Sequence, residues 1–174
     1  MKQSTINRTL AIFCAFCWVI GAFTLSAQAQ TDNWLWVKTI DSVKGRISPT
    51  CITSDLNGNT YIAGSFQGQA KFGDSTLISS GSNDAFLVKY NRKGDIVWAQ
   101  KFGNTNNESI TGIAMDGSDN LYVVGNFLSD TLKIGWQEIY LTSHTSIFLA
   151  RISSNGDVSW ADAPRAVGAS SSFK

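Results

Sequence analysis

The sequence contains few of the residues on which most catalytic and metal sites depend. Among its 174 residues there is one histidine, His144, and there are two glutamates, Glu108 and Glu138. A single imidazole excludes a two-histidine metal site. The carboxylates cluster nowhere along the chain, so no acid–base pair can be assigned. We therefore expect no cofactor, no metal ion and no catalytic residue, and we favour a protein that is not an enzyme.

Charge of either sign is also scarce. Charged residues make up 16% of the chain, and 14 basic residues against 13 acidic ones give a formal net charge of +1. This balance excludes strong electrostatic attraction to nucleic acid or to an anionic membrane. The 43% hydrophobic and 11% aromatic content excludes a disordered tail and indicates a folded domain.

The three cysteines do not support a disulfide framework. Cys14 and Cys17 lie in an apolar N-terminal stretch, so only Cys51 remains if that stretch is removed. A nucleophilic Cys51 would need a basic partner, and the one histidine is far away in the sequence. We interpret Cys51 as a small core residue.

The N-terminal stretch is typical of a secretory signal peptide. Lys2 and Arg8 precede an uncharged run, Thr9–Thr31, that ends in Ala27-Gln28-Ala29. A basic start, an apolar middle and small residues before the cut are the features of such a peptide. We predict a signal peptide over residues 1–29, cleaved after Ala29, and a secreted or cell-surface protein with no membrane insertion after cleavage. The run is long enough to span a bilayer, so an uncleaved anchor is the alternative.

Tryptophan recurs at a fixed interval, which indicates an internal repeat. Trp36, Trp98 and Trp160 are separated by 62 residues each. Further aromatic and glycine positions follow the same frame at intervals of 61 or 62: Tyr61 and Tyr122, Gly64 and Gly125, Phe66 and Phe127, Phe86 and Phe148. We interpret these residues as structural anchors of two repeat units.

Each unit has the pattern of consecutive β-strands. Apolar runs such as 122–124 and 148–150 are separated by turns such as Asn57-Gly58, in which glycine supplies a positive φ. These runs do not alternate cleanly, which favours strands covered on both faces, as in stacked four-stranded sheets. We predict an all-β fold of β-propeller-type four-stranded blades. The expected units are 41–101 and 102–163, preceded by an orphan strand at 34–40 and followed by a C-terminal tail, 164–174.

The recurring motif resembles a known family. Its residues in the first unit are Asp55-x-x-Gly58-Asn59-x-Tyr61-x-x-Gly64-x-Phe66, Phe72-Gly73, Gly81-x-x-Asp84-x-Phe86-x-x-Lys89 and Gly94-x-x-x-Trp98-Ala99. This pattern is similar to the bacterial β-propeller repeat of exported and cell-surface proteins, and the similarity covers residues 34–163. The second unit departs from it, with Ser143 and Ser146 at the positions of Gly81 and Asp84. The resemblance implies a propeller fold and an extracytoplasmic scaffold or binding role.

Two sequence features are candidates for ligand contact. Asp55, Asn57 and Asn59 alternate as calcium ligands do, but Phe66 stands where a bidentate glutamate is needed, so we favour a hairpin turn with side-chain-to-backbone bonds. Trp136 is the tryptophan whose counterpart in the other unit is not aromatic, since Asp74 stands there. We therefore name Trp136 as a candidate contact for a ligand. We expect His144, by contrast, to be an exposed loop residue.

Two blades and one additional strand do not close a ring, because propellers usually have roughly 4 to 8 blades. The chain is then the N-terminal piece of a longer propeller, one member of a ring of several copies, or an open stack capped by its tail. Open blades also favour self-association. For function, we favour an exported, non-enzymatic scaffold that binds protein or glycan at the cell surface or outside the cell. The alternative is part of a propeller enzyme that acts on extracellular polysaccharide.

Overall fold

The two repeat units form two separate main β-sheets, and a hairpin of the second unit forms a third, two-stranded sheet. The computed structural model describes residues 35–140 and 146–164, which contain eleven strands and no helix. No helix able to cross a membrane is found in this part of the chain. The prediction of an all-β fold with propeller-like, four-stranded blades is confirmed.

Blade 1 contains the first five strands. Its sheet has the order β1-β2-β4-β5, and β3 pairs with the far end of β2. The strands are β1 (Asp41–Ser54), β2 (Thr60–Phe72), β3 (Ser75–Ile78), β4 (Asp84–Tyr90) and β5 (Ile96–Phe102). All neighbouring strands are antiparallel, as expected when consecutive strands are joined by tight turns.

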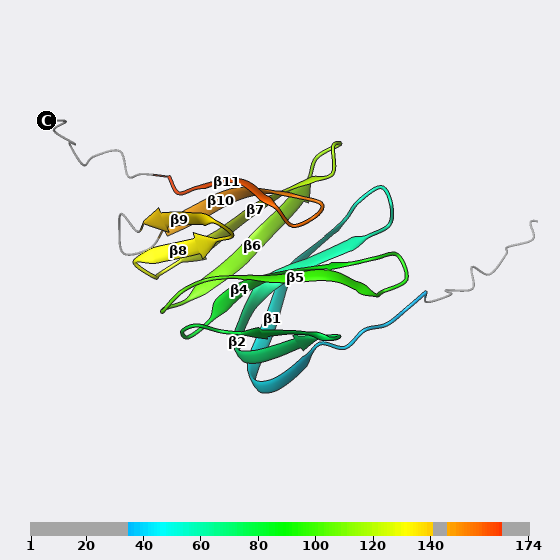
Figure 1. Ribbon diagram of the computed structural model, residues 1–174, viewed down its shortest axis with the longest axis horizontal. Coiled ribbons are helices and arrows are strands. Elements are labelled where there is room, and N and C mark those ends of the chain that lie inside the picture. Colours follow the sequence, from blue (N-terminus) through cyan, green and yellow to red (C-terminus); the bar gives the residue numbers. More distant parts are fainter. Residues whose placement is uncertain (1–34, 141–145, 165–174) are drawn as a thin grey trace, which may run out of the picture. The chain divides into compact units, whose positions relative to one another are not determined.

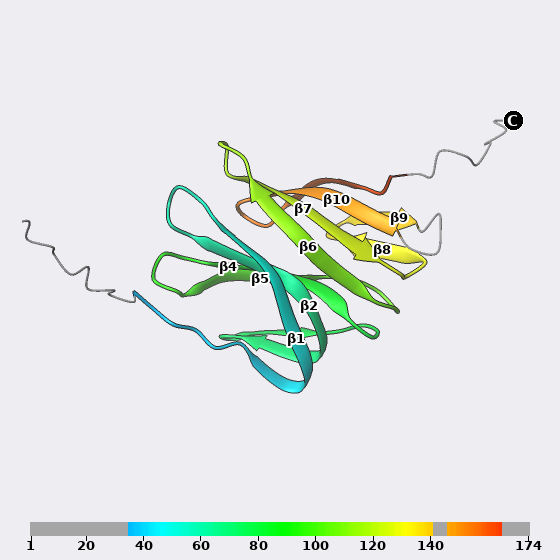
Figure 2. The ribbon, with the colours of Figure 1, turned by 180° about the vertical axis from the view of Figure 1, so that it is seen from behind.

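Blade 2 repeats this order. Its sheet is β6-β7-β10-β11, and the β8–β9 hairpin takes the place of the β3 extension. The strands are β6 (Glu108–Met115), β7 (Asn120–Phe127), β8 (Thr131–Ile134), β9 (Gln137–Tyr140), β10 (Ser146–Ser153) and β11 (Val158–Asp162). In Figures 1 and 2, β6 of this blade runs beside β1 of blade 1, where Thr50 Oγ1 donates to the carbonyl of Ile110 at 2.6 Å.

One type of five-residue turn joins the strands at four places. It begins with a side-chain oxygen that accepts from the backbone N–H groups two and four residues later. The first residues of the four turns are Asp55, Asn91, Asp116 and Ser153. The turns join β1 to β2, β4 to β5, β6 to β7 and β10 to β11. Short polar side chains therefore fix the register of both blades.

The anchor phenylalanines lie in two hydrophobic cores. The larger core is shared by the two blades and includes Tyr61 and Leu87 of blade 1 with Val123 and Phe148 of blade 2. The smaller core covers the other face of blade 1. It contains Phe66, Phe72, Phe86, Val88 and Tyr90, with Trp36, Ile40 and Ile47 packed against it. Blade 1 is thus covered on both faces.

Two anchor glycines permit close approach of neighbouring strands. Gly64 on β2 and Gly125 on β7 are equivalent positions. A Cβ at Gly64 would collide with the carbonyl of Ser48, and one at Gly125 with the carbonyl of Ser109. Both carbonyls belong to the preceding strand of the same blade. The recurrence of glycine in the sequence therefore has a steric cause.

The orphan strand expected over residues 34–40 is not formed in residues 35–40, and Trp34 lies outside the described residues. Strand pairing begins only at Asp41, which lies opposite Lys71 on β2. A strand needs a hydrogen-bonding neighbour, and residues 35–40 have none in the described chain. Trp36 nevertheless stacks on Tyr90, with ring centroids 5.9 Å apart and planes at 24°. Its side chain is held by packing rather than by a sheet.

Candidate functional site

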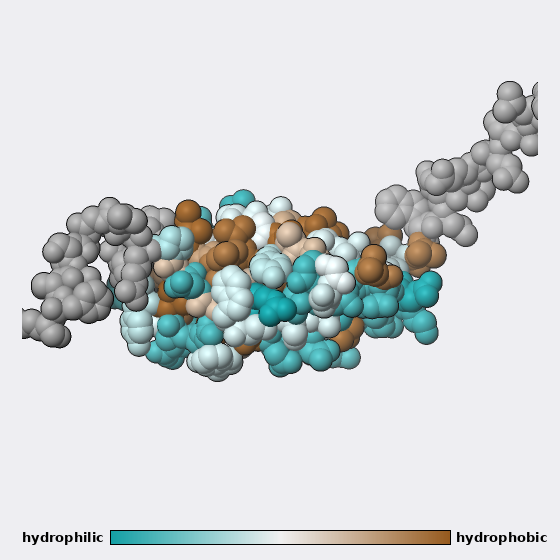
Figure 3. Space-filling view, turned by 90° about the horizontal axis from the view of Figure 1, so that it is seen from above, coloured by the Kyte–Doolittle hydropathy of each residue, from teal (hydrophilic) through white to brown (hydrophobic). Residues whose placement is uncertain are grey.

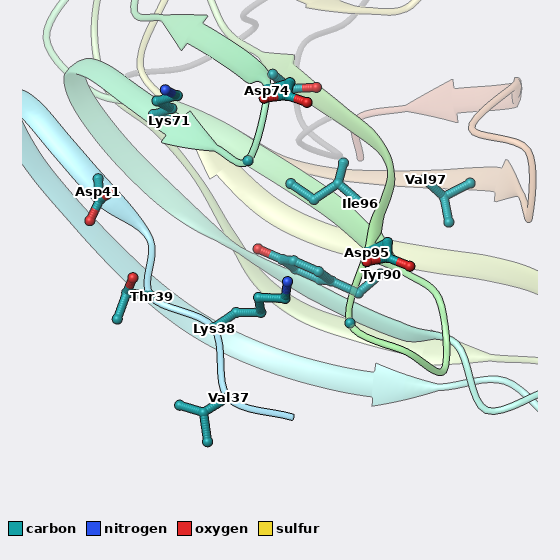
Figure 4. A pocket seen from close by; sticks show the side chains of 13 residues that line it. Val37, Lys38, Thr39, Asp41, Lys71, Asp74, Tyr90, Asp95, Ile96 and Val97 are labelled. Carbon is teal, nitrogen blue, oxygen red and sulfur yellow. The ribbon is translucent and has the colours of Figure 1, made fainter. Parts of the chain in front are cut away.

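Two equivalent grooves run along the blades, each beside a β-hairpin. Groove 1 has a volume of about 630 Å³ and lies between residues 37–41 and the β2–β3 turn of blade 1. Figure 4 shows Tyr90 and Ile96 lying between the Val37–Asp41 segment and the side chains of Lys71 and Asp74. Groove 2 has a volume of about 740 Å³ and lies between β5 of blade 1 and the β8–β9 hairpin of blade 2.

The two grooves have the same lining in the repeat frame. Ten positions separated by 62 residues line both, and five of them hold the same or a similar residue: Lys71 and Lys133, Gly73 and Gly135, Gly94 and Gly156, Asp95 and Asp157, Ile96 and Val158. A feature that recurs in both units follows from the fold itself. The residues that differ between the grooves are therefore the ones that give each groove its own binding properties.

Trp136 is the aromatic residue among those that differ in groove 2, and Asp74 takes its place in groove 1. The other differing positions of groove 2 are Ala99, Gln100, Lys101 and Gly103, where groove 1 has Val37, Lys38, Thr39 and Asp41. Trp136 is 75% exposed, although it is a large apolar side chain. Its indole Nε1 donates to the carbonyl of Val158 at 3.0 Å, which fixes one edge of the ring. A ring that is exposed and also held in place loses little conformational freedom when a ligand stacks on it.

Polar groups line groove 2 beside this ring. Lys101 forms an ion pair with Asp84 at 3.1 Å, and Lys133 forms one with Glu138 at 3.3 Å. Gln100 Nε2 donates to the carbonyl of Gly156 at 2.9 Å and so joins the two walls. The groove therefore combines one aromatic surface with fixed donors and acceptors, which is the usual composition of a small-ligand site.

Two buried carboxylates lie behind groove 2. A Cβ added to Gly103 would be 2.7 Å from Asp84 Cγ and 2.8 Å from Glu108 Oε2, so the two carboxylates flank this glycine. They are 0% and 1% exposed, and neither lines groove 2. Glu108 accepts from Ser129 Oγ at 2.6 Å and from the Asn104 N–H at 2.9 Å. Sequence reasoning missed this pair because the residues are 24 positions apart on different blades.

A further hollow, of about 530 Å³, lies where β1 and β6 meet. Polar side chains dominate its lining: Arg46, Ser48, Ser65, Asn83, Asn107, Glu108, Ser109 and Asn126, with Leu128. Asn83 Nδ2 donates to Asn107 Oδ1 at 2.7 Å and joins the blades there. These contacts connect the two sheets, and the hollow offers no exposed aromatic ring.

The Asp55 carboxylate is engaged by donors of its own turn. Oδ1 accepts from the N–H groups of Asn57 and Asn59, and Oδ2 accepts from Asn59 Nδ2 at 2.7 Å and Tyr61 OH at 3.1 Å. Burial raises the pKa of Asp55, but these hydrogen bonds outweigh burial and hold the pKa below its ordinary value of 3.8. The arrangement is the hydrogen-bonded turn that the sequence favoured over a calcium loop.

The other candidate residues are placed as follows. Cys51 is a free, half-buried thiol that packs against the larger core. His144, Ser143 and the predicted cleavage position Ala29 lie outside the described residues. Within residues 35–140 and 146–164, no group of three or more His, Cys, Asp or Glu side chains is arranged to hold a metal ion.

Comparison with known proteins supports the propeller assignment. No family model matches the chain. It is similar to an uncharacterized WD repeat-containing protein of Acanthamoeba polyphaga mimivirus, with 25% identity over 111 residues. The alignment covers 53% of this chain and 8% of that protein, so the chain spans a small part of this relative. The blades and this similarity together support a propeller-type repeat scaffold.

Proposed function

We propose that the protein is an exported, non-enzymatic propeller scaffold that binds a glycan through groove 2. A repeat scaffold offers loops and grooves for binding, and the fold alone assigns no reaction. The observation that carries the proposal is Trp136, an exposed and fixed indole at a position where the equivalent groove has Asp74. The apolar face of a sugar ring packs well on such an indole.

The polar groups around Trp136 suit the hydroxyl groups of a sugar. Lys133 donates, the Asp157 carboxylate accepts, and both line the same groove as the indole. A protein ligand is the other outcome of the test. An extended peptide would use the same groove, but it would need backbone pairing as well as contact with Trp136.

Export rests on the N-terminal segment. The basic start, the uncharged run and Ala27-Gln28-Ala29 support cleavage after Ala29 and an extracytoplasmic location. N-terminal sequencing and intact mass of the protein from the culture medium or cell surface test this directly. A product that begins at Gln30 supports the proposal, and one that still begins at Met1 contradicts cleavage.

The alternative, part of an enzyme that cleaves polysaccharide, has less support. Such an enzyme requires two carboxylates that reach the scissile bond. The two that lie close together, Asp84 and Glu108, are buried and engaged in hydrogen bonds with Lys101 and Ser129. Release of reducing ends from a polysaccharide panel by the purified chain would favour the enzyme over the scaffold.

The binding test uses a glycan array, with titration calorimetry of each glycan retained by the chain. Trp136→Ala is expected to weaken binding about two- to tenfold, because an aromatic stacking contact contributes about 0.5 to 1.5 kcal/mol. The matched control is Asp74→Ala in groove 1, which should leave the affinity unchanged. Equal affinities of the wild type and the Trp136→Ala variant would contradict the proposed site.

A further inference from the structure

One face of blade 2 is open where the equivalent face of blade 1 is covered. In blade 1 this face is fully buried against blade 2 at four positions: Tyr61, Ala63, Ala85 and Leu87. The counterparts in blade 2 are Tyr122, 36% exposed, Val124, 37%, Ile147, 56%, and Leu149, 40%. We call these four residues the blade 2 face. Figure 3, which views the molecule from the blade 2 side, shows hydrophobic surface among the hydrophilic residues there.

The covered face of blade 1 also holds a turn of its neighbour by hydrogen bonds. Lys89 Nζ and Trp98 Nε1 both donate to the carbonyl of Ser154, at 2.9 and 3.1 Å. Gln100 Nε2 donates to the carbonyl of Gly156 in the same turn. Blade 1 thus binds the β10–β11 turn of blade 2 through three side-chain donors.

Blade 2 repeats most of this set of side chains. Arg151 stands at the position of Lys89 and Trp160 at that of Trp98. Tyr122 and Trp160 meet edge to face, with ring centroids 6.4 Å apart, as Tyr61 and Trp98 do at 6.0 Å. Within residues 35–140 and 146–164, the Nε of Arg151 is buried and has no hydrogen-bond partner. Lys89, the counterpart of Arg151, donates to the turn of a neighbouring blade, and Arg151 lacks the equivalent acceptor in the described chain.

We propose that the blade 2 face, with Arg151 and Trp160, binds a further blade of the same repeat type. The bound blade presents a tight turn whose backbone carbonyl accepts from Trp160 and Arg151. Asp162 stands in place of Gln100 and can only accept, so the turn offers a donor there. Val124 and Ile147 are larger than Ala63 and Ala85, so the facing side chains are correspondingly smaller.

The structure favours a blade with a free turn over a second copy of this chain. The equivalent turn of blade 1 is already covered by its own N-terminal segment. A Cβ on Gly94 in that turn would lie 2.7 Å from Trp36 Cδ2, and one on Gly156 would lie 3.4 Å from Trp98 Cε2. Trp36 therefore occupies on blade 1 the place that Trp98 occupies on blade 2. A second copy would have to displace its own Trp36.

This inference concerns assembly and is independent of the proposed glycan site, because Trp136 is not part of the blade 2 face. The test places a blade of known sequence beside the face by inserting a second copy of residues 103–164 between Pro164 and Arg165. One chain keeps the natural face. A second carries Val124→Ala, Ile147→Ala and Asp162→Gln, which give the face the residues of blade 1.

The readout is oxidation of Tyr122 and Trp160 by hydroxyl radicals, measured by mass spectrometry in the natural and extended chains. We expect oxidation of both side chains to fall several-fold in the second extended chain and less in the first. Leu149→Asp should abolish this protection. If Tyr122 and Trp160 are protected only in the second extended chain, the result supports the requirement for small facing side chains and for a donor opposite Asp162. Unchanged oxidation in both extended chains, or an added unit that stays unfolded in both, would overturn the proposal.

Self-association is measured on the natural chain by sedimentation. A concentration-dependent dimer that Leu149→Asp dissociates would show that a second copy occupies the face, and it would overturn the choice of a blade with a free turn. A monomer at all concentrations agrees with the proposal.

Discussion

The two blades have the same strands and turns, but they differ in what covers their faces. Blade 1 is packed on one face by Trp36 and Ile40 and on the other by blade 2. Blade 2 is packed only on the side of blade 1 within the described residues. Tyr61 is consequently a core residue and Tyr122, its repeat counterpart, a surface residue. A residue that recurs in both repeat units therefore occupies the same position in a strand of each blade. Whether its side chain is buried depends on the neighbouring blade.

The two grooves also combine residues that the repeat fixes with residues that differ between the blades. Their lysine, glycine and aspartate positions recur at 62-residue intervals, and these positions follow from the fold. Trp136 and Asp74 break the recurrence within the hairpins, and residues 37–41 and 99–103 differ as well. A residue that departs from an otherwise repeated lining has no structural role imposed by the repeat, and it is the better candidate for ligand specificity.

We expect the largest difference in stability between equivalent substitutions at Leu87 and Leu149. Both leucines lie on the same face of their blades, but in the described chain only Leu87 is covered by a neighbouring blade. Leu87→Ala should lower the free energy of unfolding by about 2 to 5 kcal/mol, because it leaves a cavity between the blades. Leu149→Ala should cost less than about 1 kcal/mol, because that side chain already meets solvent. Urea unfolding followed by circular dichroism measures both. Equal losses would show that Leu149 is buried in solution.

The next largest difference in stability is expected between alanine substitutions of Asp55 and Asp116, which begin equivalent turns in the two blades. Asp55→Ala removes four hydrogen bonds and leaves the buried Tyr61 hydroxyl without its acceptor, so we expect a loss of about 1 to 3 kcal/mol. Asp116→Ala removes only bonds within an exposed turn, and its loss should be smaller. Thermal unfolding of the two variants in the same buffer gives the comparison.

The pH dependence of stability provides the control for Asp55. Its folded-state pKa lies below the ordinary value of 3.8, so its contribution is complete above that pH and is lost as the pH falls through the folded-state pKa. Asp55→Asn should therefore reduce the fall in the free energy of unfolding at low pH. Backbone hydrogen bonding by Asn120 also holds the pKa of Asp116 below its ordinary value, so Asp116→Asn should reduce the loss of stability at low pH further. A fall at low pH that Asp55→Asn leaves unchanged would contradict the assignment.

The strands and turns could be predicted from sequence because their causes are local. Gly58 and Gly94 mark turns, and the tryptophan interval marks the unit. Lys71 and Lys133 of the two grooves are also 62 residues apart in the sequence. The sequence does not show that these residues line a groove, because that depends on where the hairpins lie in the fold. The outcome at Asp55 illustrates the same locality, because every donor to its carboxylate lies within six residues.

The features that sequence reasoning missed depend on contacts between blades. The approach of Asp84 to Glu108 depends on how the connection from β5 to β6 packs, since both carboxylates lie beside Gly103 in that connection. The expected strand at 34–40 required a neighbouring strand, and in the described chain Trp36 packs on Tyr90 instead. The interval of 62 residues correctly indicates the place of Trp36 beside the Gly94 turn, but it does not indicate whether the backbone there is paired.

The hydrogen bond from Trp98 to the Ser154 carbonyl is tested by Trp98→Phe, with Trp160→Phe as the equivalent substitution in blade 2. The first substitution removes the donor to the Ser154 carbonyl and should cost about 1 kcal/mol. The second alters a ring beside the open face, and we expect a loss within about 0.5 kcal/mol, as for other surface changes. Chemical unfolding detected by circular dichroism avoids the change in fluorophore. A larger cost for Trp160→Phe would show that its indole is already bound in the isolated chain.

The smallest effect is expected at the turn position where a positive φ falls on glycine in blade 1 and on aspartate in blade 2. Asp119 has a φ of 59° where blade 1 has Gly58 at 79°. Relief of left-handed strain favours Asp119→Gly, but glycine also gains freedom in the unfolded chain, so the net gain should be at most about 0.5 kcal/mol. Gly58→Asp should lose a similar amount, since a Cβ there meets only Arg92 Cβ at an ordinary 3.5 Å. Opposite signs for the two substitutions in thermal unfolding would establish that backbone conformation, rather than a side-chain contact of Asp119, sets the difference between the turns.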